Sequence, residues 1–202
     1  TDLDITTDAR PEQLLDVVNG WADAVWEQGR EFGTIGLRKG DVTMEVTTHR
    51  AEAYVSDSRK PEVTFSDDLA EDLSRRDFTV NALALRLLPE LQLIDPYDGA
   101  IDLAEGRLRT PLEPEEAFRD DPLRMLRAAR FMAGYALEPE QGITEAVEAM
   151  RQRMQIVSAE RVRDELCKLM VVQDPSVGLW FLADTALSDQ FLPELRGLRL
   201  EH

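Results

Sequence analysis

The sequence has few of the residues that build disulfide frameworks, transition-metal sites or membrane spans. Its 202 residues include one cysteine, Cys167, and two histidines, His49 and His202. A single cysteine excludes a disulfide within the chain and is typical of a reducing setting. No apolar run approaches the ~20 residues that a membrane-spanning helix needs, and we see no signal peptide. The sequence therefore predicts a cytoplasmic globular protein, with Cys167 at an apolar helical position.

Lysine is also scarce, and acidic residues dominate the charge. Of the 23 basic residues 20 are arginine, against 40 acidic residues, which gives a net charge of −17. This acidity argues against a basic nucleic-acid-binding face over the whole molecule, because phosphate neutralisation requires clustered lysine and arginine. Arginines nevertheless concentrate at 75–76, 107–109 and 119–130. The composition is therefore compatible with a local nucleotide pocket in an acidic protein.

Hydrophobic periodicity divides the chain into a mixed first half and a helical second half. An extended pattern over 1–6 precedes a helix that begins near Pro11. Lys39-Gly40-Asp41 predicts the turn of a hairpin, and Ser66-Asp67-Asp68-Leu69 predicts a capped helix start. We therefore expect an α+β domain followed by an all-helical one. The predicted hairpin strands are 33–37 and 42–48, a further strand pair is 82–88 and 91–94, and the predicted later helices are 115–134, 139–153, 158–172 and 175–188.

Two carboxylates in the first strand form a candidate metal site. Asp2 and Asp4 are two residues apart, so both project from the same face of a strand. Two adjacent carboxylates repel each other unless a cation lies between them, and Mg²⁺ prefers such oxygen donors. Glu45, on the second hairpin strand, is a candidate for a third carboxylate, and a salt bridge to an arginine is an equal alternative. A solvated strand face is the alternative for the whole group.

The segment Arg75-Arg76-Asp77-Phe78-Thr79-Val80-Asn81-Ala82 brings several polar groups together. Arg76 is a candidate phosphate ligand, and Asp77 and Asn81 are candidate partners of sugar hydroxyls. The alternative is a helix end, where the helix dipole favours arginines near the negative pole.

The densest motif is Asp120-Asp121-Pro122-Leu123-Arg124-Met125-Leu126-Arg127-Ala128-Ala129-Arg130-Phe131. Asp121 is a suitable N-terminal cap for a helix, and Pro122 is suitable in the first turn of that helix. Arginines at every third position drift by about 120° around the helix from 124 to 130, so their long side chains can converge on one ligand with base edges and phosphates. A capped, salt-bridged surface helix is the alternative. The later segment 158–166, with Ser158 as cap, is predicted to brace the preceding helices.

The order of these motifs resembles the class II tRNA nucleotidyltransferases, which comprise the CCA-adding enzymes and their bacterial poly(A) polymerase relatives. The similar blocks are Asp2-Leu3-Asp4, Glu45 to Arg50, Arg75 to Ala82, Asp120 to Phe131 and Ser158 to Leu166. The resemblance implies a polymerase-β-like nucleotidyltransferase head over 1–113, with a mixed sheet and helices. It implies an all-helical neck and body over 114–202.

The same resemblance implies a reaction and its residues. Asp2 and Asp4 would hold two catalytic Mg²⁺ ions for the transfer of nucleotides from CTP and ATP to the 3′ end of tRNA. Asp121 and Arg124 would read the base edges of both nucleotides. The remaining implied nucleotide contacts are Arg76, Arg127 and Arg130 to phosphate or neighbouring groups, and Asp77 and Asn81 to the ribose.

The sequence departs from the family pattern in two respects. Members carry a Gly-Gly-x-Val-Arg-Asp turn ahead of the acidic pair, and this sequence begins at Thr1 without it. The pattern also has Glu-Asp where this chain has Asp120-Asp121. We therefore expect the sequence to be part of a longer protein and to bind nucleotide and tRNA weakly by itself. Two alternative functions stay open, a poly(A) polymerase that uses ATP alone and a non-catalytic nucleotide-binding module.

Overall fold

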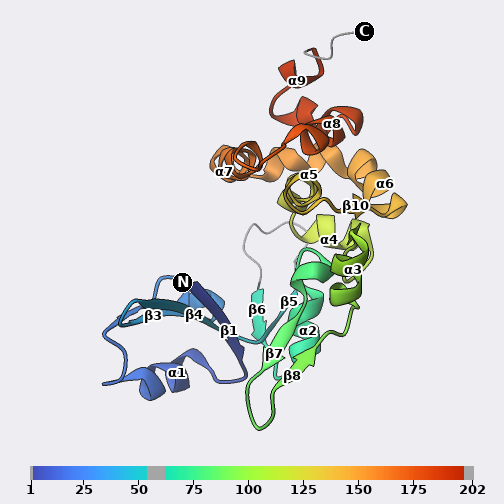
Figure 1. Ribbon diagram of the computed structural model, residues 1–202. Coiled ribbons are helices and arrows are strands. Elements are labelled where there is room, and N and C mark those ends of the chain that lie inside the picture. The colour runs from blue at the N-terminus through green and yellow to red at the C-terminus, as the bar shows by residue number, and fades with distance from the viewer. Residues whose placement is uncertain (1, 54–61, 198–202) are drawn as a thin grey trace. The chain divides into compact units, whose positions relative to one another are not determined.

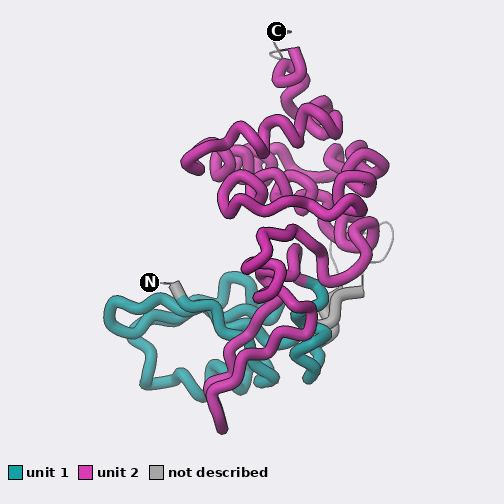
Figure 2. Tube along the Cα trace, turned by 45° about the vertical axis from the view of Figure 1, so that its right-hand side comes forward, with its two compact units in different colours: residues 1–75 teal, residues 76–202 magenta. Residues whose placement is uncertain are grey.

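The computed structural model describes residues 2–53 and 62–197, which fall into two compact units. Unit 1 comprises residues 1–75 and unit 2 comprises residues 76–202 (Figure 2). The predicted division into a head over 1–113 and a helical part over 114–202 follows the family resemblance rather than compactness. That division stays a prediction.

Unit 1 is built on a four-stranded mixed sheet with the strand order β1-β4-β3-β2 (Figure 1). β1 (Asp2–Thr7) runs parallel to β4 (Val42–Thr48), and β3 (Thr34–Lys39) pairs antiparallel with both β4 and β2 (Ala24–Trp26). The predicted hairpin is confirmed. Gly40 lies at its turn with a φ of 57°, which a residue without Cβ adopts at no steric cost.

One face of this sheet is covered by α1 (Pro11–Val18). Leu14 and Val18 of the helix form a small buried cluster with Leu37 and Val46 of the strands. Because successive strand residues alternate between faces, their immediate neighbours in β3 and β4 project to the opposite face of the sheet. The apolar packing of α1 therefore leaves the polar residues of β1 and β4 on the other side.

The rest of unit 1 comprises a short helical turn, a second strand pair and one helix. β5 (Arg50–Ala53) and β6 (Glu62–Phe65) are antiparallel, and η1 (Arg30–Phe32) precedes β3. α2 (Leu69–Ser74) begins as predicted, because the Asp68 carboxylate accepts a hydrogen bond from the Ala70 amide at 2.8 Å.

Unit 2 begins with a tight turn and a short strand pair. η2 (Thr79–Asn81) is followed by β7 (Ala84–Arg86) and β8 (Gln92–Ile94), which pair antiparallel. The predicted strand pair is therefore confirmed, although each strand is shorter than expected. α3 (Gly99–Glu105) and β9 (Arg107–Leu108) complete this part.

The prediction of one continuous helix over 115–134 is wrong. The structure has α4 (Pro114–Asp120) and α5 (Leu123–Tyr135), separated by Asp121 and Pro122. Proline has no amide hydrogen and disfavours helical geometry in the residue before it. Asp121 accordingly adopts an extended conformation, with φ −138° and ψ 101°.

The helices predicted over 139–153, 158–172 and 175–188 are present, but the first ends in a 3₁₀ turn and the last stops at Asp184, ahead of a separate 3₁₀ turn over 187–190. None of the helices in the described part of the chain is long and apolar enough to cross a membrane.

The side chain of Cys167 is exposed, whereas an apolar helical position was expected for it. The remaining elements are β10 (Glu138–Pro139), α6 (Gln141–Met150), η3 (Arg151–Ile156), α7 (Ala159–Met170), α8 (Ser176–Asp184), η4 (Leu187–Gln190) and α9 (Glu194–Gly197).

The core of unit 2 is centred on α5, which packs against α7 and α8. Met125, Leu126 and Ala129 are completely buried. α8 approaches α5 closely at Gly178, where a Cβ atom would lie 2.5 Å from the carbonyl oxygen of Ala129. This distance is too short for a real Cβ contact, so the two helix backbones depend on the missing side chain.

We predict that Gly178→Ala lowers the free energy of unfolding by about 1–3 kcal/mol, because the new methyl group forces α8 away from α5. Gly134→Ala, in α5, is the matched control. Its Cβ would meet only Val172 Cγ1 at 3.5 Å, and alanine is the better helix former by up to ~1 kcal/mol. Chemical denaturation of both variants measures the difference. Equal stabilities would contradict the close approach.

Candidate functional site

In unit 1, the open face of the sheet carries a row of side chains across all four strands. Asp4 of β1 is in register with Glu45 of β4, and Glu45 is in register with Gly36 of β3. Gly36 in turn lies opposite Trp26, whose indole covers it so closely that a Cβ atom would lie 1.8 Å from Nε1. Residues in register on adjacent strands share a face, so two exposed carboxylates stand side by side next to a flat indole.

This arrangement suits the chemistry of the predicted metal site. Asp4 and Glu45 are carboxylates on adjacent strands and open to solvent, which is the donor type that a hard divalent cation prefers. The side chain of Asp2 lies outside the described residues. Among the side chains that are described, no three or more histidine, cysteine or acidic residues form a group that could hold a metal ion. The metal assignment therefore stays a prediction that the donor chemistry fits.

In unit 2, Asp77 connects the segment 76–82 to α5. Its Oδ1 atom accepts hydrogen bonds from the Phe78 amide at 2.9 Å and from Asn81 Nδ2 at 3.0 Å. Its Oδ2 atom accepts from Arg127 Nε at 2.8 Å and from Nη2 at 2.5 Å. Four donors fill the roughly four acceptor positions of a carboxylate. Asp77 and Asn81 are thus partners within the protein, and a direct contact of Asp77 with ribose requires displacing one of these donors.

A pair of aromatic rings strengthens the same connection. Phe78 is completely buried and packs on Phe131 of α5, with ring centroids 5.1 Å apart. The guanidinium groups of Arg130 and Arg127 lie 4.6 Å and 5.7 Å from the Phe131 ring centroid, within the range of cation–π attraction. Two consecutive residues, Asp77 and Phe78, therefore bind α5 through charge and packing at once.

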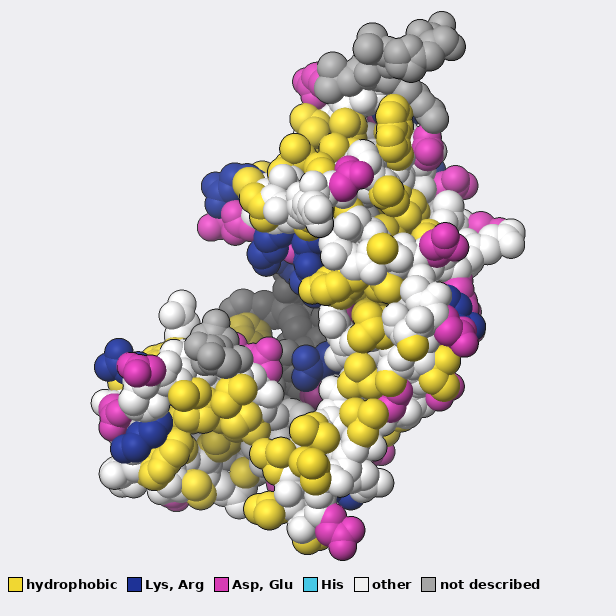
Figure 3. Space-filling view, viewed as in Figure 1, with side chains coloured by type: hydrophobic (Ala, Val, Ile, Leu, Met, Phe, Trp, Pro, Cys, Tyr) yellow, Lys and Arg dark blue, Asp and Glu magenta, His cyan; other side chains and the backbone are white. Residues whose placement is uncertain are grey.

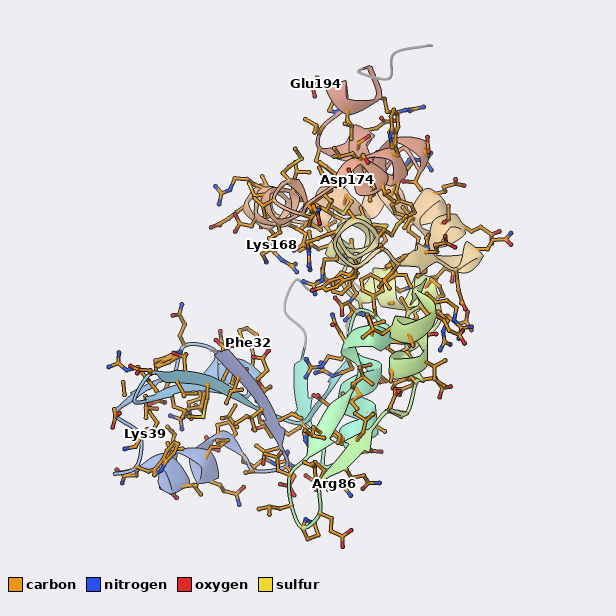
Figure 4. All side chains as sticks on the ribbon, in the orientation of Figure 1. Phe32, Lys39, Arg86, Lys168, Asp174 and Glu194 are labelled. Carbon is orange, nitrogen blue, oxygen red and sulfur yellow. The ribbon has the colours of Figure 1, made fainter. Side chains whose placement is uncertain are left out.

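The arginines of α5 meet a buried carboxylate on α7. The Glu165 side chain is only 3% exposed and accepts a short hydrogen bond from Arg130 Nε. Arg127 Nη1 lies 3.9 Å from this carboxylate and Lys168 Nζ, labelled in Figure 4, lies 3.7 Å from it. Dark-blue side chains accordingly gather over α5 and α7 in Figure 3. Arg127 and Arg130 thus converge on a protein carboxylate, whereas Arg124 Nη1 donates to the Ala117 carbonyl oxygen at 3.3 Å.

Glu165 is not among the residues predicted from the sequence, although its spacing on the helix contains a signal. Val162 and Leu169 are both buried on the inner face of α7, and Glu165 lies between them at helical spacing. A carboxylate on a buried helix face requires cationic partners, because an unpaired buried charge is very costly. The pattern therefore indicates that Glu165 has a cationic partner, but it does not indicate which arginines these are.

A second missed carboxylate supports the segment 76–82 from α3. Asp102 is completely buried and accepts hydrogen bonds from Thr79 Oγ1 at 2.7 Å and from Arg109 Nε at 2.8 Å. At Gly99, a Cβ atom would lie 2.0 Å from the Thr79 carbonyl oxygen, so only glycine permits this contact. The turn that carries Asp77 and Asn81 is therefore fixed from two directions.

Asp121 combines the predicted cap with an ion pair. Its Oδ1 atom accepts from the Leu123 amide at 3.1 Å, and its Oδ2 atom accepts from Arg161 Nη2 at 2.8 Å. Arg161 lies in the first turn of α7, where Ser158 Oγ accepts from its amide at 3.4 Å, so the predicted cap of this helix is confirmed. Of the other predicted ligands, Arg76 is exposed at the start of unit 2.

We predict that Glu165→Gln lowers the free energy of unfolding by about 2–3 kcal/mol, because Arg130 and Arg127 lose a buried counter-charge. The expected decrease is smaller than the usual cost of breaking a buried ion pair, because the Arg127 side chain is 29% exposed and keeps some hydration. Lys168→Gln is the control. Its side chain is 62% exposed, so the change is expected within ~0.5 kcal/mol. Thermal and urea unfolding measure both, and equal effects would contradict the central role of Glu165.

Comparison with known proteins identifies the family. Residues 1–109 match the family described as the poly(A) polymerase head domain, and this match covers more than half of the chain. The chain belongs to the poly(A) polymerase and CCA-adding enzyme family. The resemblance inferred from the motifs is thus confirmed. Residues 136–198 match a second family, described as the probable RNA and SrmB-binding site of polymerase A.

Individual relatives and solved structures agree with this assignment. The chain is 40% identical to a Bacillus velezensis CCA-adding enzyme over 199 residues and 35% identical to a Lactobacillus helveticus one over 197 residues. Each match covers 97% of this chain and 48% of the relative, so the chain spans about half the length of these relatives. The Bacillus stearothermophilus CCA-adding enzyme in complex with CTP has a TM-score of 0.83 and 33% identity, over 98% of this chain and 46% of that one.

Proposed function

We propose that this chain provides the nucleotide-binding and catalytic part of an RNA nucleotidyltransferase that adds C, C and A to tRNA 3′ ends without a nucleic-acid template. The observation that carries the proposal is similarity along 97% of the chain to proteins named CCA-adding enzymes. The substrates are CTP, ATP and the tRNA 3′ end, and the proposed compartment is the cytoplasm. Two structures similar to this chain are complexes of CCA-adding enzymes with CTP and with ATP.

Base choice is assigned to Asp121 and Arg124. Cytosine and adenine both present an exocyclic amino donor next to a ring-nitrogen acceptor, so one carboxylate and one guanidinium serve either base. Uracil and guanine present a carbonyl oxygen in place of that amino group, and the carboxylate repels it. Asp121 lies in the break between α4 and α5, and Arg124 is the second residue of α5, so both groups are at the start of the same helix.

Phosphate binding is assigned to Arg76, Arg127 and Arg130. Arg127 and Arg130, together with Lys168, exceed by one charge the two carboxylates, Asp77 and Glu165, that they contact. The group therefore keeps a net positive charge in a chain that is otherwise strongly acidic, and this charge suits a triphosphate. Because protein carboxylates already orient these arginines, little reorganisation is needed when a nucleotide binds.

Asp2 and Asp4, with Glu45 as a third candidate, are the proposed ligands of two Mg²⁺ ions. Bound Mg²⁺ supplies Lewis-acid stabilisation of the phosphoryl charge and activates the RNA 3′-hydroxyl. The position of Asp4 and Glu45 in register on adjacent strands supports the assignment. Neither carboxylate is needed for the packing of α1, which uses the opposite face of the sheet.

The direct test is nucleotide incorporation into a 3′-truncated tRNA with Mg²⁺. CTP and ATP are supplied separately and together to this chain and to a chimaera in which it replaces the matching half of the Bacillus velezensis relative. Ordered addition of C, C and A by the chimaera supports the proposal. Long tails with ATP alone favour the poly(A) polymerase alternative, and a folded chimaera without turnover favours the non-catalytic module.

We predict that Asp4→Ala in the chimaera lowers incorporation at least ~100-fold, because metal ligation contributes several kcal/mol to transition-state stabilisation. Asp41→Ala is the control, since Asp41 is an exposed acid in the turn between β3 and β4 of the same sheet. Both variants are expected to keep the wild-type melting temperature, because neither side chain is buried. Near-normal incorporation by Asp4→Ala would rule out the metal assignment.

We predict that Asp121→Ala removes the preference for CTP and ATP over UTP and GTP, because the acceptor of the exocyclic amino group is lost. The substitution also removes a helix cap, which costs ~1 kcal/mol by itself. Asp68→Ala is the matched control, since Asp68 caps α2 through the same contact with the amide two residues on. Melting temperature and nucleotide choice are measured for both. If Asp121→Ala changes only the melting temperature, as Asp68→Ala does, Asp121 is merely a cap.

A further inference from the structure

Two donors from different elements hold the Asp121 carboxylate. The Leu123 amide of the adjoining helix binds Oδ1, and the Arg161 guanidinium of α7 binds Oδ2 at 2.8 Å. Rotation of a carboxylate about its Cβ–Cγ bond is soft, so one donor leaves the plane of the group free to turn. Two donors on opposite oxygens fix that plane. The orientation of Asp121 therefore depends on a residue 40 positions away in the chain.

The position of Arg161 is unfavourable for the helix that carries it. With Ser158 as the cap, Arg161 is the third residue of α7, where the helix dipole favours an acid and a capping box places glutamate or glutamine. A cation in this turn is therefore unfavourable. The stability of α7 thus gives no reason for an arginine here.

The ion pair also contributes little to the stability of unit 2. The Arg161 side chain is 53% exposed and that of Asp121 is 25% exposed, and such solvated pairs contribute almost nothing to the free energy of unfolding. The effect of Arg161 is instead geometric, because its planar guanidinium restricts where Oδ2 lies.

We propose that Arg161 is a positioning residue that determines base specificity by orienting Asp121. Each carboxylate oxygen accepts about two hydrogen bonds, so one acceptor position remains on each oxygen after Leu123 and Arg161 have bound. Arg161 directs such a position toward the exocyclic amino group of cytosine or adenine. The inference rests on the base-reading role in the proposed function. Without Arg161, Asp121 keeps its cap but turns, and the preference for amino-bearing bases falls.

Nucleotide affinity of the chimaera with the Bacillus velezensis relative tests the inference. Equilibrium dialysis gives the ratio of CTP to UTP affinity for the wild type, Arg161→Gln, Arg161→Lys and Arg163→Gln. Arg163 is the matched control on the same helix, because it is exposed and forms an ion pair with Asp164 at 2.7 Å. The hydrogen bond to Asp164 raises the pKa of the Arg163 guanidinium, so this residue carries a full charge in the comparison. We expect Arg161→Gln to lower the ratio about tenfold, as loss of one charged hydrogen bond allows. Arg161→Lys keeps the charge but not the planar guanidinium, so it is expected to restore the ratio only in part. Arg163→Gln keeps the ratio within about twofold.

The design separates failure of this inference from failure of the proposed function. A chimaera with the wild-type chain that binds UTP as tightly as CTP contradicts the base-reading site itself. A wild type that discriminates, together with an Arg161→Gln variant that discriminates equally well, overturns the role of Arg161. Adding Arg161→Gln to Asp121→Ala should change the ratio no further, because the two act as one unit. An additional loss in that double variant, or equal losses in Arg161→Gln and Arg163→Gln, would also overturn it.

Discussion

The arrangement of unit 2 depends on the ion network that joins Asp77, Arg127, Glu165 and Arg130. Removing a charge from water costs several kcal/mol, and the mutual attraction of the charges offsets this only where hydrogen bonds satisfy the buried groups. The network meets this condition by joining three elements. The segment that carries Asp77 binds α5, and α5 binds α7, so the network connects all three elements.

This constraint explains why the residues assigned to nucleotide binding already have partners within the protein. A guanidinium that carries out its function on a phosphate needs a fixed direction, and a protein carboxylate behind it supplies one. Asp77 and Glu165 act in this way on the arginines of α5, and Arg161 acts on the carboxylate of Asp121. In the first case a carboxylate from a distant element orients an arginine, and in the second an arginine from a distant element orients a carboxylate.

Much of the secondary structure follows from local patterns, and so do the candidate residues. The turn at Gly40, the caps at Asp68 and Ser158 and the pairing of β7 with β8 involve near neighbours in the sequence. At Asp121 two local signals disagreed: Asp121 and Pro122 predicted a helix start, whereas the spacing of polar and apolar residues predicted one helix over 115–134. The extended backbone of Asp121 decides between the two.

The sequence by itself determined the order of the elements, the family motifs and the types of group available for chemistry. Only the tertiary structure decided which charged groups meet. An arginine fork binds a phosphate and a protein carboxylate with the same geometry, so spacing along α5 cannot distinguish the two. Arg127 reaches Asp77 across 50 positions and Arg130 reaches Glu165 across 35. Contacts of that range arise from the packing of whole helices, which no local pattern encodes.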